Sequence, residues 1–182
     1  MNHFHIVKQD KAPEILKLFV EIKKGDFNKY EYNKDLGILE LDRVLHGPTF
    51  YPVAYCDVPN TWNEGDNDPL DAVVYSTGEI MPGVLVTGRV IGMMEMNDNG
   101  EEDHKIICVN HKDPRYDHVK TVNDLAPGEL TDLRNFFEIY KIAQVGRDKV
   151  TVGRFLGPEE AYKLINQAIV VYKKKFGNEN TD

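Results

Sequence analysis

Alternation of apolar and polar residues predicts strands along the first part of the chain. Every second residue from 16 to 22 is apolar, which is the period of a strand with one buried face. Lys29 and Glu31 share one face of a second predicted strand. A polar stretch over 33–37 predicts a turn, and its Gly37 can adopt a positive φ. A returning strand over 38–45 is expected to follow.

The middle of the chain continues in the same way. Residues 84–96 alternate imperfectly, and Gly88 and Gly92 interrupt them, which favours bulges or bends in a curved sheet. The sequence Asn97-Asp98-Asn99-Gly100 is a strong hairpin signal. Asp98 precedes the tip of this predicted hairpin and Asp103 follows it, so both carboxylates can reach one space large enough for a metal ion.

The apolar pattern becomes helical in the last part of the chain. Leu130, Leu133, Phe137 and Tyr140 recur at helical spacing after Pro127, with Val150 and Val152 suggesting one more strand beyond them. A second helix is expected after Pro158, and its apolar stripe would be Ala161, Leu164, Ile165, Ala168 and Tyr172. Strands first and helices late predict an α+β fold, in which helices cover one side of a closed or curved sheet.

Composition narrows the class of protein. The 182 residues predict a single domain over 1–182. The net charge of −8 argues against nucleic-acid binding, which requires a basic surface. Cys56 and Cys108 are too few for a disulfide framework, and no apolar stretch is long enough to span a membrane. The first residues also lack the pattern of a signal peptide. A soluble cytoplasmic protein is therefore expected.

Three acids within six residues are the first candidate for chemistry. In the sequence Asp66-Asn67-Asp68-Pro69-Leu70-Asp71, a bend at Pro69 could bring the three carboxylates onto one centre. Such anions repel one another unless a cation lies between them, and oxygen ligands suit a hard ion such as Mg²⁺. The spacing excludes a calcium-binding loop, because Asp71 stands where that loop has glycine. An acidic surface turn remains the alternative interpretation.

Other charged and aromatic residues also have structural alternatives. Arg43 lies on the apolar side of its predicted strand, where it needs a charged partner or an anionic ligand. For Lys29 and Arg43 a structural salt bridge is the alternative, and Tyr51 and Tyr55 could simply pack in the core. Glu21 could be a solvated strand residue. Trp62 is expected in a loop or at a subunit contact, and His3 and His5 are expected in a mobile terminus.

The run from Glu64 to Val74 resembles the D-G-D-P-x-D signature of the soluble family I inorganic pyrophosphatases, in their short prokaryotic form. The resemblance extends from about Val20 to Lys141, because further matching segments occur before and after this run, in the family's order. These segments are Lys29-Tyr30-Glu31, Asp42-Arg43, Phe50-Tyr51-Pro52-Val53-Ala54-Tyr55, Asp98 to Lys105, and Phe136-Phe137-Glu138-Ile139-Tyr140-Lys141. The resemblance implies a closed five-stranded barrel of the oligonucleotide-binding kind, with extra strands and the two late helices packed against it.

The resemblance also implies a function. The expected reaction is Mg²⁺-dependent hydrolysis of inorganic diphosphate to two orthophosphates, with several ions per site and Mn²⁺, Zn²⁺ or Co²⁺ as possible substitutes. Asp68 would be the general base beside the attacking water. The implied metal ligands are Asp66, Asp71, Asp98 and Asp103. The implied phosphate ligands are Lys29, Arg43, Tyr55, Lys105, Tyr140 and Lys141, with Glu21, Glu31 and Tyr51 completing the site. Short members of the family are commonly homohexamers.

Two positions depart from the family pattern. Asn67 stands where the family usually has glycine between the first two aspartates, and Cys56-Asp57 follows Tyr55 in place of the usual glycine. Asn tolerates the left-handed region better than most residues, and neither change removes a group to which the resemblance assigns a role. The runner-up function is a non-catalytic protein that binds divalent metal or phosphate on the same fold.

Overall fold

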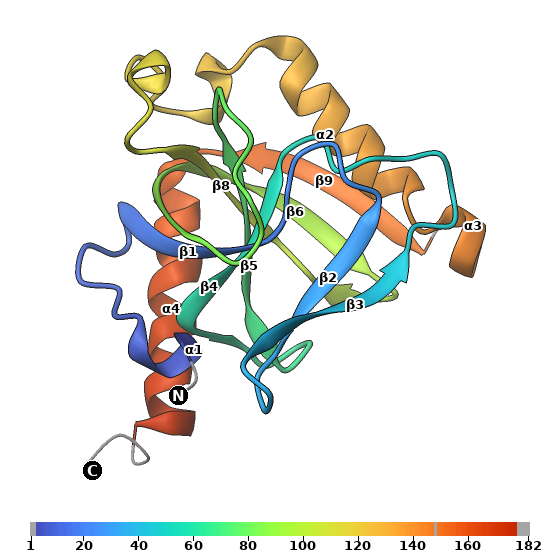
Figure 1. The fold of residues 1–182 in the computed structure, drawn as a ribbon. Coiled ribbons are helices and arrows are strands. Elements are labelled where there is room, and N and C mark those ends of the chain that lie inside the picture. The colour runs from blue at the N-terminus through green and yellow to red at the C-terminus, as the bar shows by residue number, and fades with distance from the viewer. Residues whose placement is uncertain (1–2, 148, 178–182) are drawn as a thin grey trace.

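The computed structural model describes residues 3–147 and 149–177. Its centre is a closed barrel in which β1 pairs with both β4 and β6, and the ring continues through β5 and β8 (Figure 1). The β5–β8 pair is parallel and the other pairs are antiparallel. The barrel strands are β1 (Ile15–Ile22), β4 (Ala54–Asn63), β5 (Asp68–Tyr75), β6 (Leu85–Asp98) and β8 (Lys105–Asn110). The predicted α+β fold with a five-stranded barrel is confirmed.

Additional strands extend the barrel on one side. The short β7 (Glu101–Glu102) and β9 (Val150–Leu156) both pair with β6. A separate hairpin of β2 (Asn28–Asn33) and β3 (Ile38–Val44) stands beside the barrel (Figure 1). Its turn contains Gly37 at φ +73°, as the sequence predicts. The hairpin therefore forms a second wall that faces the barrel strands.

Gly92 marks the bulge that the sequence predicts in β6. The register with β8 shifts between Val90 and Gly92, and Gly92 has φ +156°. A Cβ atom at this position would lie 2.2 Å from the carbonyl oxygen of Leu156 on β9. Only glycine allows β9 to approach β6 this closely, so the extra strand depends on Gly92.

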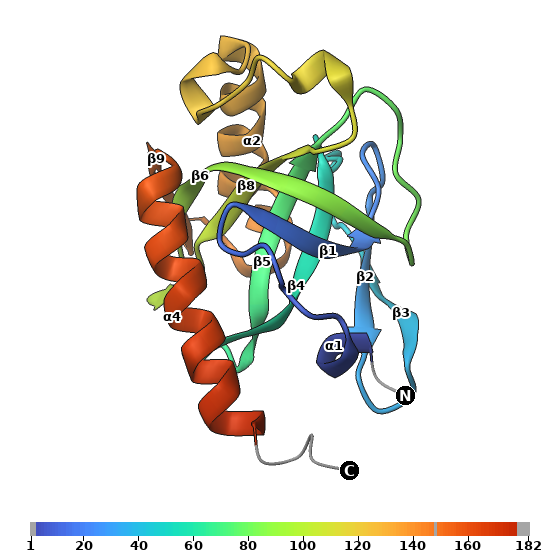
Figure 2. The ribbon, with the colours of Figure 1, turned by 90° about the vertical axis from the view of Figure 1, so that its left-hand side faces the viewer.

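Two helices cover opposite faces of the strands, so the expectation that both would lie on one side of the sheet is wrong. The first, α2 (Pro127–Ile139), packs with alternate strand residues such as Val73 and Ile107. The second, α4 (Pro158–Phe176), packs on the neighbouring set, which includes Ala72 (Figure 2). Each strand thus sends successive side chains to two different clusters. None of the helices in the described part of the chain has the length and hydropathy of a membrane-crossing segment.

Residues 3–6 differ from the sequence analysis, which expected His3 and His5 in a mobile terminus. Residues His3–Ile6 form a short helix, α1, in which Phe4 is buried and the Nδ1 atom of His5 lies 2.7 Å from the Tyr172 hydroxyl. Trp62 belongs to β4 and is buried in the same aromatic cluster, so its placement in a loop is wrong. Aromatic packing between α1 and α4 holds the start of the chain in place, which its mixed local sequence does not reveal. Three more elements were not predicted, namely α3 (Ile142–Val145) and the 3₁₀ turns over 114–116 and 122–124.

Candidate active site

A cavity of about 500 Å³ opens between the β2–β3 hairpin, the barrel strands and the end of α2. Its charged wall is dominated by acids, with three lysines among them. The acids are Glu21, Glu31, Asp57, Asp66, Asp68, Asp71, Asp98, Glu101, Glu102 and Asp103, and the lysines are Lys29, Lys34 and Lys141. Such a surface attracts cations strongly and accepts an anion only together with them.

Strand register places three of the charged groups in one row. Asp57 on β4 lies opposite Asp71 on β5, and Asp71 lies opposite Lys105 on β8. Because neighbouring residues in register point to the same face of a sheet, the three side chains lie beside one another. The row lies on the sheet face that α2 covers, since Val73 and Ile107 two residues further on pack with that helix.

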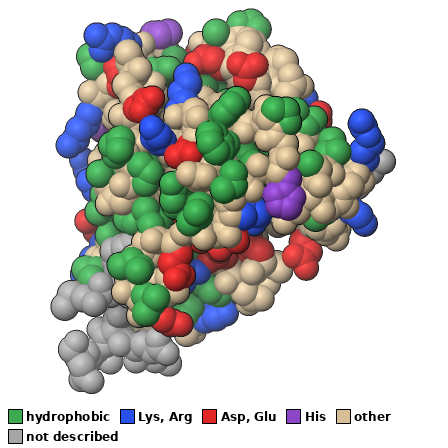
Figure 3. All heavy atoms as spheres, turned by 45° about the vertical axis from the view of Figure 1, so that its right-hand side comes forward, with side chains coloured by type: hydrophobic (Ala, Val, Ile, Leu, Met, Phe, Trp, Pro, Cys, Tyr) green, Lys and Arg blue, Asp and Glu red, His purple; other side chains and the backbone are tan. Residues whose placement is uncertain are grey.

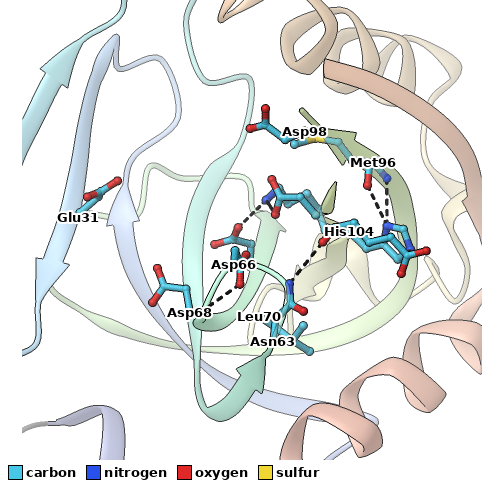
Figure 4. Close-up of polar contacts among 12 residues, drawn as sticks. Glu31, Asn63, Asp66, Asp68, Leu70, Met96, Asp98 and His104 are labelled. Atoms are coloured by element: carbon cyan, nitrogen blue, oxygen red, sulfur yellow. Dashed lines mark hydrogen bonds and ion pairs between the residues drawn. The ribbon is translucent and has the colours of Figure 1, made fainter. Parts of the chain in front are cut away.

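The turn before β5 brings Asp66 and Asp68 to the same cavity (Figure 4). The bend falls at Asn67, which has φ +58°, rather than at Pro69, which already belongs to β5. The backbone N–H of Asp68 donates to Asp66 Oδ1 at 3.1 Å and stabilises the turn. Asparagine is one of the few residues that adopt this left-handed conformation readily, so the loop needs no glycine at position 67.

Lys105 is buried behind the acids and is not part of the cavity wall. Its Nζ atom lies 2.5 Å from Asp71 Oδ2 and 2.5 Å from Asp103 Oδ1, and only 2% of the residue is exposed. Burial alone would lower the pKa of Lys105, but the charges of Asp71 and Asp103 offset it and leave the pKa raised. In this structure Lys105 therefore contacts the predicted metal ligands instead of the space where a phosphate would bind.

Lys141 and Asp98 close one end of the cavity. Lys141 lies two residues after the end of α2, and its Nζ atom forms an ion pair with Asp98 at the end of β6. Tyr140 beside it is buried, and burial raises the pKa of its hydroxyl, as it does for Tyr51 and Tyr55. The three tyrosines thus stay neutral at physiological pH and can donate hydrogen bonds into the cavity.

Glu21 is buried, so the interpretation of this residue as a solvated strand position is wrong. It lies where the register of β1 shifts, between Val20 and Ile22, and the bulge directs it into the cavity. The backbone N–H of Tyr32 donates to its Oε1 atom at 2.6 Å. Burial raises its pKa to about 8.

Lys29 and Arg43, two basic residues of the hairpin, differ in their position relative to the cavity. Lys29 lines the cavity and pairs with Glu31, whereas Arg43 does not reach the cavity wall. The Nη1 atom of Arg43 pairs with the neighbouring Asp42, and its buried Nε atom has no hydrogen-bond partner among the described residues. Arg43 still lies close enough to Tyr51 to lower the pKa of that hydroxyl against the effect of burial. Part of the hydrogen-bond donor capacity of Arg43 is thus unused.

The structure adds cavity residues that the sequence analysis did not assign, among them Asp57 and Lys34. Asp57 belongs to β4 and is 8% exposed, and burial raises its pKa well above the ordinary range. Its position two residues after Tyr55 on a strand was the available signal, because the two side chains share a face. Lys34 comes from the β2–β3 turn and forms an ion pair with Asp68. A lysine in a polar turn carries no distinguishing pattern.

The donor set fits a hard divalent cation. Carboxylate oxygens predominate on the cavity wall, and the cavity has room for several ions with their water. Among the described residues, no three potential ligands already converge at metal-binding distances. The lysines instead form ion pairs with individual carboxylates, Lys34 with Asp68 and Lys141 with Asp98. Metal binding would therefore require these pairs to open or share their acids.

Comparisons with known proteins match nearly the whole chain. A family model described as inorganic pyrophosphatase matches residues 18–173. An inorganic pyrophosphatase of Geobacillus stearothermophilus is 44% identical over 162 residues, which cover 89% of this chain and 96% of that protein. The crystal structure of inorganic pyrophosphatase from Thermus thermophilus has a TM-score of 0.89 at 39% identity, covering 95% of this chain and 99% of the other. A Helicobacter pylori inorganic pyrophosphatase structure has a TM-score of 0.86 at 34% identity, with 92% and 98% covered.

Proposed function

The chain belongs to the inorganic pyrophosphatase family and hydrolyses inorganic diphosphate with the help of divalent metal ions, and we propose how its own residues divide this work. The observation that carries the proposal is the convergence of Asp66, Asp68 and Asp71 with Lys29 and Lys141 on one cavity. The acids can hold cations, while the lysines can bind the phosphate oxygens. Hydrolysis of a phosphate anhydride requires both.

We propose Mg²⁺ as the working metal. Asp66, Asp71 and Asp103 would hold one ion, and Asp98 with Asp103 would hold another that arrives with the substrate. When bound, such ions supply positive charge for the diphosphate and lower the pKa of a water molecule. Lys105 fixes Asp71 and Asp103 from behind, so that their free oxygens stay directed at the cavity.

Asp68 is proposed as the general base. The cavity walls partly desolvate the Asp68 carboxyl and raise its pKa, although the ion pair with Lys34 opposes that rise. A carboxylate with a raised pKa is a better proton acceptor near neutral pH than an ordinary one. The phosphate oxygens would be bound by Lys29, Arg43, Tyr55, Tyr140 and Lys141.

The activity is tested by measuring orthophosphate release from diphosphate with Mg²⁺ and with a chelator. Release that depends on the metal is expected. Tight binding of diphosphate without release would instead identify a protein that has kept the site and lost turnover.

Mg²⁺ should raise the melting temperature of the protein. The acids of the cavity outnumber its lysines. A ligand that binds only the native state stabilises it by about 2.7 kcal/mol at a hundred times its Kd. Melting curves in chelator and in millimolar Mg²⁺ provide the measurement, with Na⁺ at matched ionic strength as control. Identical curves would contradict a cation site in this cavity.

Arg43→Lys should lower kcat/KM about tenfold or more, because hydrogen bonds to a charged group are worth about 1.5–3 kcal/mol and lysine lacks the planar fork. Steady-state kinetics with saturating Mg²⁺ would measure the change. Arg154→Lys is the matched control, because Arg154 pairs with Glu95 outside the cavity. Wild-type kcat/KM in Arg43→Lys would make Arg43 a structural partner of Asp42 only.

A homohexamer is proposed as the state in solution. Large apolar side chains are exposed on and beside the β2–β3 hairpin, among them Phe27, Ile38, Leu41, Phe50 and Met81. Figure 3 shows hydrophobic side chains gathered over much of the face turned to the viewer. Exposed apolar area of this extent is typical of an interface. Sedimentation equilibrium should give a mass six times the 20.8 kDa of one chain, as expected for a homohexamer. A monomer at micromolar concentration would contradict the proposal.

The cytoplasm is the proposed location. Cys56 and Cys108 are both free and buried, as is usual for proteins of a reducing compartment. Fractionation of the source cells with antibody detection would test it, and recovery outside the cytoplasmic fraction would refute it.

A further inference from the structure

Asp57 is a buried carboxylate that the proposed mechanism leaves without a role. It lines the cavity and only 8% of the residue is exposed. Its carboxylate makes no hydrogen bond or ion pair with any other residue that the structure describes. Burying a charged carboxylate without such partners is costly, and a cation bound from the cavity would relieve that cost.

The neighbours of Asp57 exclude an anionic partner. Glu21 and Asp71 are the acids whose charges raise its pKa most, after burial itself. Neither of two nearby lysines is paired with it, because Lys34 pairs with Asp68, and Lys105 pairs with Asp71 and Asp103. Diphosphate would be repelled from a corner with these charges. A cation is the partner that relieves the repulsion.

Strand register shows where that cation would lie. Asp71 has Lys105 opposite it on β8 and Asp57 opposite it on β4. The lysine already neutralises Asp71 from the β8 side. On the β4 side, the acids Asp57 and Glu21 line the cavity, and Lys34, whose charge acts against the raised pKa of Asp57, is paired with Asp68.

We propose that Asp57 helps to hold a divalent cation on the β4 side of Asp71, either as a direct ligand or through one bound water. This inference rests on the proposed function, because Asp71 is a metal ligand only there. Asp57 would thus be part of the cation site itself, at a position to which the family resemblance assigns no role.

Calorimetric Mg²⁺ titration of Asp57→Asn tests the inference. The substitution keeps the size of the side chain and removes its charge. At least one Mg²⁺ site should weaken about 10–100-fold, as is typical when a group that supports a ligand is removed. The melting temperature in chelator should not fall, because the lost charge had no partner. Asp113→Asn is the matched control, since Asp113 is 7% exposed but lies outside the cavity.

Asp71→Asn separates this inference from the proposed function. If Asp71→Asn loses Mg²⁺ and Asp57→Asn titrates like the wild type, the role of Asp57 is refuted and the proposed site stands. If both variants titrate like the wild type, the proposed metal site is itself wrong. A large fall in melting temperature with normal Mg²⁺ affinity would make Asp57 a structural residue.

A measurement on the unaltered protein covers the case in which Asp57→Asn does not fold. Crystals soaked in Mn²⁺ would locate each ion by anomalous diffraction. An ion within direct or one-water reach of the Asp57 carboxylate supports the inference. Full occupancy of the other sites with no ion in that reach overturns it.

Discussion

Asp68→Asn should lose turnover by about 10²–10⁴-fold, the usual contribution of a general base, and should keep most of its affinity for Mg²⁺. Asparagine preserves the size of the side chain and removes its basicity. The Asp68 side chain is 55% exposed at the start of β5 and has Lys34 as its ionic partner, so it can reach a water in the cavity. The remaining activity should rise with pH, because hydroxide becomes available without the base.

Asp71→Asn is the variant with which the Mg²⁺ affinity and turnover of Asp68→Asn should be compared. Asp71 lies at the centre of the row with Asp57 and Lys105, and its loss should reduce Mg²⁺ binding and turnover together. Calorimetric titration and a pH–rate profile should be measured for both variants. Loss of Mg²⁺ in Asp68→Asn as severe as in Asp71→Asn would show that Asp68 is a ligand rather than the base. Full turnover of Asp68→Asn at neutral pH would show that no base acts there.

Lys105→Met should reduce the free energy of unfolding of the metal-free protein by about 3–5 kcal/mol, the usual cost of removing one partner of a buried ion pair. The ammonium group lies between Asp71 and Asp103, and without it both carboxylates would lack a compensating charge. In Mg²⁺ the loss should be smaller, because a bound cation neutralises the same acids.

Urea unfolding in chelator and in Mg²⁺ would measure both values for Lys105→Met. Lys17→Met is the control, because Lys17 is exposed and its Nζ atom donates to the Thr87 hydroxyl rather than to an acid. A loss of less than 1 kcal/mol in chelator, or the same loss in Mg²⁺, would mean that Lys105 does not neutralise the metal-binding acids.

The sequence predicts most of the fold because the barrel strands and both long helices have regular apolar spacing. Gly92 and the turn after Asp98 were also located from local chemistry alone. The burial of Glu21 was not predictable, because it depends on a bulge in β1 and on the backbone of a hairpin eleven residues away. The ring packing that buries Trp62 joins the two ends of the chain, and local patterns do not show such contacts.

The candidate site was predicted less completely than the fold. The three acids around Pro69 were expected on one centre, and they do line one cavity, although the bend lies at Asn67. Asp57 was read only as a departure from a family pattern, because its importance depends on strand register with Asp71. Strand pairing across the barrel is a property of the folded chain, and no short segment of the sequence determines it.

Closure of the ring makes assembly of the cavity a late event in folding. Ile15 on β1 must find Arg89 on β6, and the parallel β5–β8 pair forms around the intervening strand β6. Contacts between such distant segments form slowly, because the entropy of closing the loops must be overcome first. A nascent chain that has emerged only to Asp71 displays its acids without Lys105 or Lys141. The ribosome must therefore release most of the chain before the acidic segment gains the lysines that balance it.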